Sequence, residues 1–347
     1  MKKSVDPKSG ERMLCVVSHT HWDREWYLPF EQFRLRLVDL VDNLLRIIEE
    51  YPAFVFHLDA QTIVLKDYLE IRPDREALLK RHISNGNIIV GPWYVQNDFY
   101  LTSGEATIRN LLFGTAMAQE FGACARVGYT PDQFGIIGQL PQILHSFGSD
   151  SCVFGRGYSP RIFFMLGSDS THELPPSEFV WEGSDGTRIL GIHLPYWYNN
   201  CQRISRDPAK ARRLIQAITD SQQGLASTPF LLLMNGVDHF EAQENLLPIL
   251  EGLNQDLPAG TTIRQTTLQD YVSQVRHHRE AHQLQTPVFR GELRNGNNHN
   301  LLQNTLSARI YLKTANVQLQ NLIQHVLEPL YSMIAAAGAG DQYDIQY

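Results

Sequence analysis

Three side chains that could bind a metal ion stand at every second position near the start of the chain. They are His19, His21 and Asp23 in the segment SHTHWDREW, which directly follows an apolar run. Spacing by two puts side chains on one face of an extended segment, and imidazole nitrogens and carboxylate oxygens are ordinary zinc ligands. Polar side chains that hydrogen bond to the next loop would give the same pattern. Spacing alone therefore leaves a metal site and a structural role equally open.

Two carboxylates follow other apolar runs and could act as an acid–base pair. Asp132 lies in GYTPDQFG after the run 127–130, and Asp238 lies in NGVDH after the run 230–234. Glycosidases need two carboxyl groups that flank the bond to be broken, one of them protonated. An aspartate in a loop rich in proline and glycine is also a common turn or helix-capping residue. A catalytic role for the pair is better supported when it is considered together with the three candidate metal ligands at positions 19, 21 and 23.

Aromatic residues after predicted strands could contact a sugar. Trp26, Trp93 and Tyr94 occupy such positions, and an aromatic face suits the apolar face of a sugar ring. Packing in the core or in a loop explains any one of them at least as well.

Further polar residues have less definite roles. Arg156 follows the run 151–155 and could bring a cation into the site or pair with a structural carboxylate. Asp59 and Asp98 are strand-end carboxylates without an assigned partner. His299 lies in the loop NGNNHNLL and is of interest as a further metal ligand.

These candidates must be positioned by alternating strands and helices. Strands are predicted at 14–17, 54–58, 87–91, 127–130, 151–155, 230–234 and 262–264. Helices are predicted at 33–47, 73–84, 104–121, 138–147, 208–221, 241–253 and 268–277. The runs 179–182 and 188–193, separated by the turn GSDG, indicate a hairpin. Strand–helix alternation implies parallel βα units in a barrel-like arrangement with the site at the strand ends.

The alternation of predicted strands and helices stops near residue 287. From 305 to 337 apolar residues recur at helical spacing, which predicts a helical unit from about 290 to the end. Such an apolar helix has few partners in this sequence, so we expect the chain to end inside a domain. An uncovered helix of this kind would favour self-association, which makes a homo-oligomer possible.

Composition narrows the class of protein. The 347 residues include 30 Lys and Arg against 37 Asp and Glu, a net charge of −7, and 43% are hydrophobic. An acidic chain lacks the basic surface of a nucleic-acid or anionic-membrane binder, so neither partner is expected. The four cysteines are widely spaced and form no zinc ribbon or disulfide framework. With no secretory signal or membrane-spanning run predicted, we expect a cytoplasmic protein.

The segments around these residues resemble glycoside hydrolase family 38, the zinc-dependent α-mannosidases. The resemblance is strongest to the bacterial branch that includes mannosylglycerate hydrolases. The matching segments are HTHWDREWYLPF (19–30), LDAQTIVLKDYLEIRP (58–73), GPWYVQNDFYLTSGEATIRNLLFG (91–114), GYTPDQFGIIGQLPQIL (128–144), VFGRGYS (153–159) and LSARIYLK (306–313). Their order along the chain is the order expected for the family.

The resemblance implies one zinc ion per chain. The family's metal-binding His-x-Asp falls on His21 and Asp23, so His19 becomes a neighbour and not a ligand. A third ligand falls on Asp132. The fourth falls on His299, which stands one position before the place that the family spacing implies.

The resemblance also implies the catalytic roles. The nucleophile falls on Asp132, and the general acid/base falls on Asp238. Trp26 takes the place of the tryptophan beneath the sugar. We expect the substrate to contact Trp26, Trp93 and Arg156.

The fold and activity that the resemblance implies are specific. A seven-stranded (β/α) barrel-like catalytic domain would occupy residues 1–285, and 286–347 would begin a small helical-bundle domain that is truncated here. The β-rich domains that follow in the family would then lie outside these 347 residues. The implied activity is that of a retaining α-mannosidase acting on terminal α-mannosides, of oligosaccharide or mannosylglycerate type. Zinc would orient the mannose 2- and 3-hydroxyls.

Two other functions remain open from the sequence. A metal-dependent amidohydrolase or deacetylase also places His-x-His after its first strand, and its zinc activates water. His193 and His239 could supply its further ligands. The third hypothesis is that the chain is a catalytically silent fragment. Retention of anomeric configuration and a covalent adduct on Asp132 would distinguish the mannosidase.

Overall fold

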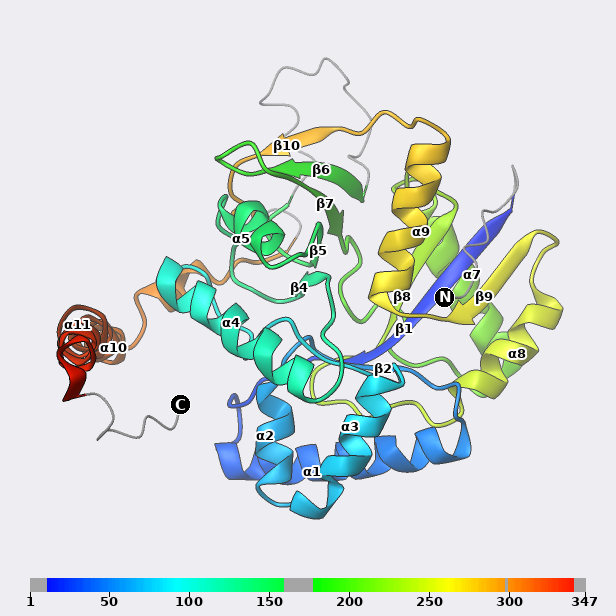
Figure 1. The fold of residues 1–347 in the computed structure, drawn as a ribbon. Helices are drawn as coiled ribbons and strands as arrows, with labels where there is room; N and C mark the ends of the chain where they lie inside the picture. The colour runs from blue at the N-terminus through cyan, green and yellow to red at the C-terminus, as the bar shows by residue number, and fades with distance from the viewer. Residues whose placement is uncertain (1–10, 159–176, 297–298, 340–347) are drawn as a thin grey trace. The chain divides into compact units, whose positions relative to one another are not determined.

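The computed structural model describes residues 11–158, 177–296 and 299–339. The chain forms two compact units, Met1–Leu301 and Leu302–Tyr347. The first unit holds two five-stranded sheets and their covering helices (Figure 1). It extends beyond residue 285, because a strand at 288–290 joins the second sheet.

The first sheet is built around β1 (Arg12–Thr20). This strand pairs in parallel with β2 (Phe56–Leu58), β8 (Phe230–Asn235) and β9 (Thr261–Gln265), and β2 pairs with β3 (Ile88–Ile89). Every residue of β1 after its first is buried. A strand that is apolar on both faces is typical of a parallel sheet with other layers on both sides.

The second sheet has the order β10-β6-β7-β5-β4. Its strands are β4 (Gly128–Thr130), β5 (Ser151–Phe154), β6 (Glu178–Glu182), β7 (Arg188–His193) and β10 (Val288–Arg290). The pairs are parallel except for β6 and β7, which form the predicted antiparallel hairpin through a turn at Gly186 with φ +86°.

The parallel α/β class is confirmed, but the strand arrangement differs from the expected one. The strands of the described residues form two sheets and not one seven-stranded barrel-like sheet. β3 has only two residues and pairs with β2 alone. It is too short to continue the ladder to β4, so the two sheets are not joined there by strand pairing.

Apart from α2, the helices cover the sheets where the apolar periodicity predicts them. They are α1 (Phe30–Glu50), α2 (Ile63–Leu69), α3 (Glu76–Ser84), α4 (Gly104–Glu120), α5 (Leu140–Ser146), α7 (Pro208–Gln222), α8 (Leu246–Asp256) and α9 (Leu268–Ala281). In Figure 1, α1, α2 and α3 lie below β1 and β2. The sequence did not predict α2, because five of its seven residues are buried and no apolar period distinguishes a face.

Strand β1 connects two hydrophobic cores. Leu14 and Val16 point into a core shared with α1, whereas Met13, Cys15 and Val17 point into a core shared with the second sheet. The alternation follows from the two-residue period of a strand. This double burial holds the end of β1 in a fixed position.

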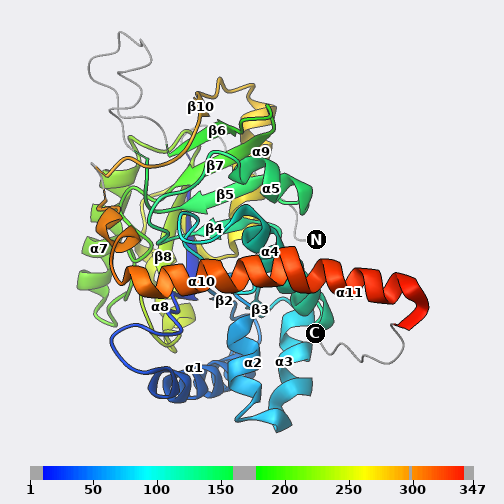
Figure 2. The ribbon, with the colours of Figure 1, turned by 90° about the vertical axis from the view of Figure 1, so that its left-hand side faces the viewer.

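The second unit is helical, as its periodicity predicts. It contains η2 (Gln303–Leu306), α10 (Ile310–Leu322), the π-helical η3 (Ile323–Leu327), α11 (Glu328–Ile334) and the π-helical η4 (Ala335–Ala339). Figure 2 shows α10 and α11 as one extended run. Large apolar side chains along it, such as Tyr311 and Met333, are exposed. None of the helices among the described residues has the length and apolar character needed to cross a membrane.

Candidate active site

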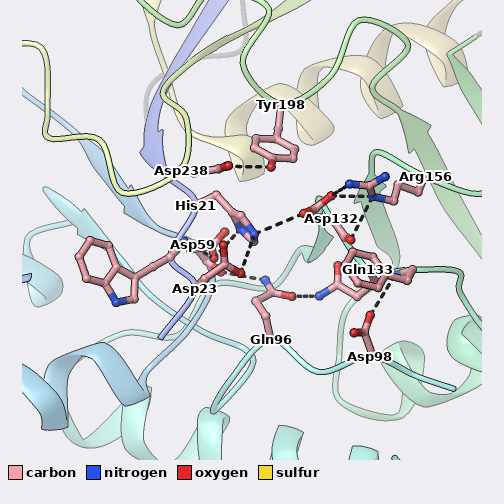
Figure 3. Close-up of polar contacts among 12 residues, drawn as sticks. His21, Asp23, Asp59, Gln96, Asp98, Asp132, Gln133, Arg156, Tyr198 and Asp238 are labelled. Carbon is pink, nitrogen blue, oxygen red and sulfur yellow. Dashed lines mark hydrogen bonds and ion pairs between the residues drawn. The ribbon is translucent and has the colours of Figure 1, made fainter. Parts of the chain in front are cut away.

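The ends of three strands bring His21, Asp132 and Asp238 together (Figure 3). His21 follows β1, Asp132 follows β4, and Asp238 follows β8. An isolated bridge pairs His21 with Asp238, and the His239 N–H donates to the His21 carbonyl at 2.8 Å. A Cβ on Gly236 would lie 2.0 Å from the carbonyl oxygen of His19. Glycine at this position therefore permits the two backbones to approach so closely.

His21 stands at the centre of the candidate site and is only 4% exposed. Its Nδ1 lies 2.9 Å from Oδ2 of Asp59. Its Nε2 faces Oδ1 of Asp23 at 3.6 Å and Oδ2 of Asp132 at 3.9 Å. Burial acts to lower the pKa of His21, but the nearby carboxylates, Asp59 first among them, outweigh it and hold the pKa well above its ordinary value.

Asp59 is itself held by several donors. Its Oδ2 accepts from the Trp22 N–H at 2.9 Å and from Nε2 of Gln61 at 2.8 Å. Gln61 in turn accepts from the Gln96 N–H at 3.0 Å. The sequence singled out Asp59 without a partner. Asp59 follows β2 and His21 follows the neighbouring strand β1. These two strand-end positions were the only indication in the sequence of a contact between them.

Asp132 forms an ion pair with Arg156. The Arg156 Nε donates to Oδ1 of Asp132 at 2.6 Å, and the Arg156 guanidinium also contacts the carbonyl of Asn300 and lies 4.5 Å from the Trp197 ring. Burial raises the pKa of Asp132 to about 6, against the opposing effects of His21 and Arg156. The sequence left open whether Arg156 brings a cation into the site or pairs with a carboxylate. It does both, because its carboxylate partner is Asp132, the candidate nucleophile.

Asp238 accepts a hydrogen bond that the sequence did not indicate. The Tyr198 hydroxyl donates to its Oδ1 at 2.8 Å, and the Tyr198 carbonyl binds Nε2 of His19 at 2.7 Å. Burial raises the pKa of Tyr198, and the charges of Asp132 and Asp238 raise it further. Tyr198 is therefore close to both carboxylates. Nothing in its local sequence, YWYNN, distinguishes it from its aromatic neighbours.

His299 lies near this group, but its ring packs against other residues. Its ring centroid is 4.4 Å from that of Trp197. Its Nε2 is buried and has no hydrogen-bond partner in the described part of the chain. Among those residues no hydrogen bond or ion pair joins His299 to His21, Asp23 or Asp132. Its predicted place as a fourth ligand stays a prediction.

The two tryptophans predicted to contact substrate lie in different environments. Trp26 is 62% exposed, and its ring lies 6.1 Å from that of His239. Trp93 is 1% exposed, donates from Nε1 to the Tyr129 carbonyl at 3.0 Å and packs against Phe99. Only Trp26 therefore presents an open face, because the ring of Trp93 is part of the core.

The histidines considered for an amidohydrolase bind backbone atoms. Nε2 of His193 lies 3.2 Å from the Gly155 carbonyl. Nε2 of His239 lies 3.0 Å from the Asp23 carbonyl. Each imidazole thus already has a structural hydrogen bond at Nε2. These hydrogen bonds leave Nδ1 of each ring as the nitrogen that could coordinate a metal.

The donor atoms around His21 have the chemistry of a zinc site. Within the described ranges no three His, Cys, Asp or Glu side chains are grouped closely enough to hold a metal ion as they stand. Nevertheless, Asp59 holds Nδ1 of His21, a contact typical of zinc-bound histidines, and the ring is turned so that Nε2 faces Asp23 and Asp132. Neighbouring ligands of a tetrahedral zinc lie about 3.4 Å apart. The distances from His21 exceed this by only a few tenths of an ångström, so the donor set fits zinc.

Comparisons with known proteins agree on one family. The sequence profile of the "Glycosyl hydrolases family 38 N-terminal domain" matches residues 12–292. A Halalkalibacterium halodurans protein named "Putative mannosylglycerate hydrolase" is 40% identical over 92% of this chain and 36% of its own. The human protein "Alpha-mannosidase 2C1" is 31% identical over 54% of this chain and 17% of its own.

A solved structure gives the same result. The crystal structure of an α-mannosidase from Enterococcus faecalis V583 matches with a TM-score of 0.86 and 36% identity. The match covers 94% of this chain and 36% of that protein. The chain therefore spans about a third of the length of these bacterial relatives.

Proposed function

The chain belongs to glycosyl hydrolase family 38, and we propose on that basis that it is the catalytic part of a retaining α-mannosidase. Its substrates would be terminal α-mannosides of oligosaccharide or mannosylglycerate type. The observation that carries the proposal is the grouping of His21, Asp23 and Asp132 beside Asp238 at the ends of β1, β4 and β8. The names of the relatives, α-mannosidases and a mannosylglycerate hydrolase, support the same substrate class.

We propose that His21, Asp23, Asp132 and His299 would hold one zinc ion per chain. When bound, the ion would supply a Lewis acid that binds and orients the 2- and 3-hydroxyls of the mannose. The buried Nε2 of His299, which has no hydrogen-bond partner among the described residues, supports its inclusion. The role of Asp59 is to keep Nδ1 of His21 protonated and Nε2 free to coordinate.

Asp132 would act as the nucleophile. Its carboxylate attacks the anomeric carbon as the glycosidic C–O bond breaks, and a covalent mannosyl-enzyme forms. Arg156 binds Oδ1, which leaves Oδ2 on the side of His21. The guanidinium also opposes the rise in the pKa of Asp132 caused by burial. It therefore helps to keep the attacking group ionised at neutral pH.

Asp238 would act as the general acid and then as the general base. It gives its proton to the leaving oxygen and later removes one from the water that attacks the mannosyl-enzyme. The Tyr198 hydroxyl fixes Oδ1, so Oδ2 is available for these transfers. Two displacements at one carbon retain its configuration.

Metal content and product configuration test the proposal together. Elemental mass spectrometry after gel filtration should find about one zinc per chain, lost in His21→Ala. Proton NMR of a reaction with an aryl α-mannoside should show α-mannose as the first product. Two metals per chain would favour the amidohydrolase, and β-mannose as first product would contradict retention.

A further inference from the structure

Trp197 adopts a backbone conformation that large residues avoid. It lies in the connection between β7 and α7, where its φ is +72°. This left-handed region is unfavourable for a residue with a bulky side chain. Residues persist there only where their surroundings hold them, and such residues cluster at functional sites. The mechanism proposed above gives Trp197 no role, so the contacts of its ring should explain why the chain accepts this conformation.

The Trp197 ring packs against two groups of the candidate site. The Arg156 guanidinium lies 4.5 Å from the ring centre, within the range of a cation–π contact. The centre of the His299 ring lies 4.4 Å from that of Trp197. Trp197 therefore contacts both the cation that pairs with Asp132 and the histidine that we propose as a zinc ligand.

The Arg156 guanidinium uses its edge and its face for different partners. Its N–H groups donate to Oδ1 of Asp132 and to the carbonyl of Asn300, the residue that follows His299. The Trp197 ring covers the planar face, a common arrangement for arginine beside an aromatic residue. Hydrogen bonds along the edge leave the guanidinium free to tilt, whereas a ring on its face restricts this movement. Trp197 therefore limits the orientation of the group that binds the proposed nucleophile.

The end of strand β5 supports the Trp197 ring. Gly155 directly follows this strand, and a Cβ at Gly155 would lie 3.2 Å from Cζ3 of Trp197. The lack of a side chain at Gly155 therefore lets the ring lie close to the strand end. The ring also packs against the core of the second sheet. Because Arg156 is the next residue after Gly155, the ring and the guanidinium are both positioned by the same strand end.

We propose that Trp197 is a positioning residue for the nucleophile. Its ring holds the Arg156 guanidinium against Asp132 and fixes the loop of His299 beside the same ion pair. Packing against the core would not by itself require an aromatic face at this position, whereas contact with a guanidinium does. The inference rests on the proposed role of Asp132, because it gives Trp197 an effect on catalysis without contact with the reacting atoms.

Two substitutions of similar size separate an aromatic contact from packing. Trp197→Phe keeps a ring for Arg156, whereas Trp197→Leu fills a similar volume without one. With an aryl α-mannoside, Trp197→Leu should lower kcat by about tenfold or more, because a small misplacement of catalytic groups is costly. Trp197→Phe should keep kcat within about threefold of the wild type, because a cation–π contact remains. Thermal unfolding of the same samples should show that both variants lower Tm by similar amounts.

Tyr196→Leu is the matched control. Tyr196 lies in the same connection, is exposed, and its hydroxyl donates to the Ser221 carbonyl at 3.0 Å. This variant should leave kcat unchanged. Equal kcat values in Trp197→Leu and Trp197→Phe would overturn the proposal, since packing alone would then explain the residue. A raised KM with unchanged kcat in Trp197→Leu would also overturn it, because Trp197 would then bind the substrate directly.

A measurement without turnover separates this proposal from the mannosidase assignment. Proton–nitrogen NMR detects the Nε–H of Arg156, which donates to Asp132 and should exchange slowly with water in the wild type. Arg156→Lys identifies the signal. Faster exchange in Trp197→Leu, but not in Trp197→Phe, would support the positioning role even if no mannoside is hydrolysed. An unchanged exchange rate in Trp197→Leu would refute that role and leave the mannosidase assignment intact.

Discussion

Nδ1 of His21 lies 2.9 Å from Oδ2 of Asp59, and the opposite nitrogen of the same ring faces Asp23 and Asp132. One carboxylate thus determines which nitrogen carries the proton and how the ring is turned. His21 and Asp59 follow adjacent parallel strands, β1 and β2, so the sheet register sets their separation. The contact links the backbone arrangement directly to the proposed zinc site.

Asp59→Asn should weaken zinc binding by about 10- to 100-fold, because the neutral amide no longer stabilises the required tautomer of His21. Competition with a fluorescent chelator measures the dissociation constant. Asp150→Asn is the matched control, since Asp150 makes a similar 2.7 Å contact with Nδ1 of the exposed His145. Equal zinc affinity in the wild type and Asp59→Asn would show that Asp59 does not orient a ligand.

Asp132→Ala should abolish mannoside hydrolysis, because it removes both the proposed nucleophile and a proposed zinc ligand. Initial rates with an aryl α-mannoside measure the effect. In the wild type, a 5-fluoromannosyl fluoride should label Asp132, and peptide mass spectrometry locates the adduct. Near-wild-type rates in Asp132→Ala, or a label on another residue, would contradict the assignment.

Trp26→Ala and Trp93→Ala should have opposite consequences, because one ring is exposed and the other is buried. Trp26→Ala should lower kcat/KM by up to about tenfold, the equivalent of a stacking contact of about 0.5–1.5 kcal/mol, with an unchanged Tm. Trp93→Ala should lower the free energy of unfolding by about 3–5 kcal/mol. Thermal unfolding and steady-state kinetics on both variants check the contrast. A loss of stability in Trp26→Ala would argue against a substrate platform.

His57→Gln should make stability less dependent on pH in the acid range. Burial, assisted by the nearby His19, lowers the pKa of His57 to about 3. The unfolded chain takes up a proton near pH 6.5, whereas the folded chain does not. The stabilisation by neutral His57 is thus complete above pH 6.5 and is lost as the pH falls toward 3.

Urea unfolding between pH 7 and pH 4 measures this dependence. The wild-type slope should exceed that of His57→Gln by up to about 1.4 kcal/mol per pH unit. Glutamine retains an oxygen that can accept the Leu268 N–H, which donates to Nε2 of His57 at 3.3 Å. Identical slopes in His57→Gln and the wild type would refute the buried, neutral state.

Local pattern was sufficient to locate most elements of the first unit. The helical period of α1 predicted the side chains that it buries, from Phe33 to Ile47. The apolar run of β1 and the GSDG turn between β6 and β7 were equally direct signals. The sequence pattern did not predict α2 or β10. The first is buried on most sides, and the second has three residues and exists only by pairing with β6.

The sequence by itself determined the family, the parallel α/β class and the chemically active residue types, because each depends on local motifs and periodicity. Only the tertiary structure decided which of these residues touch. It divided the strands between two sheets, gave Asp59 to His21, Arg156 to Asp132 and Tyr198 to Asp238, and separated exposed Trp26 from buried Trp93. The three side-chain pairs join residues 24 to 40 positions apart, which strand register and loop packing bring together. No local pattern encodes such a pairing.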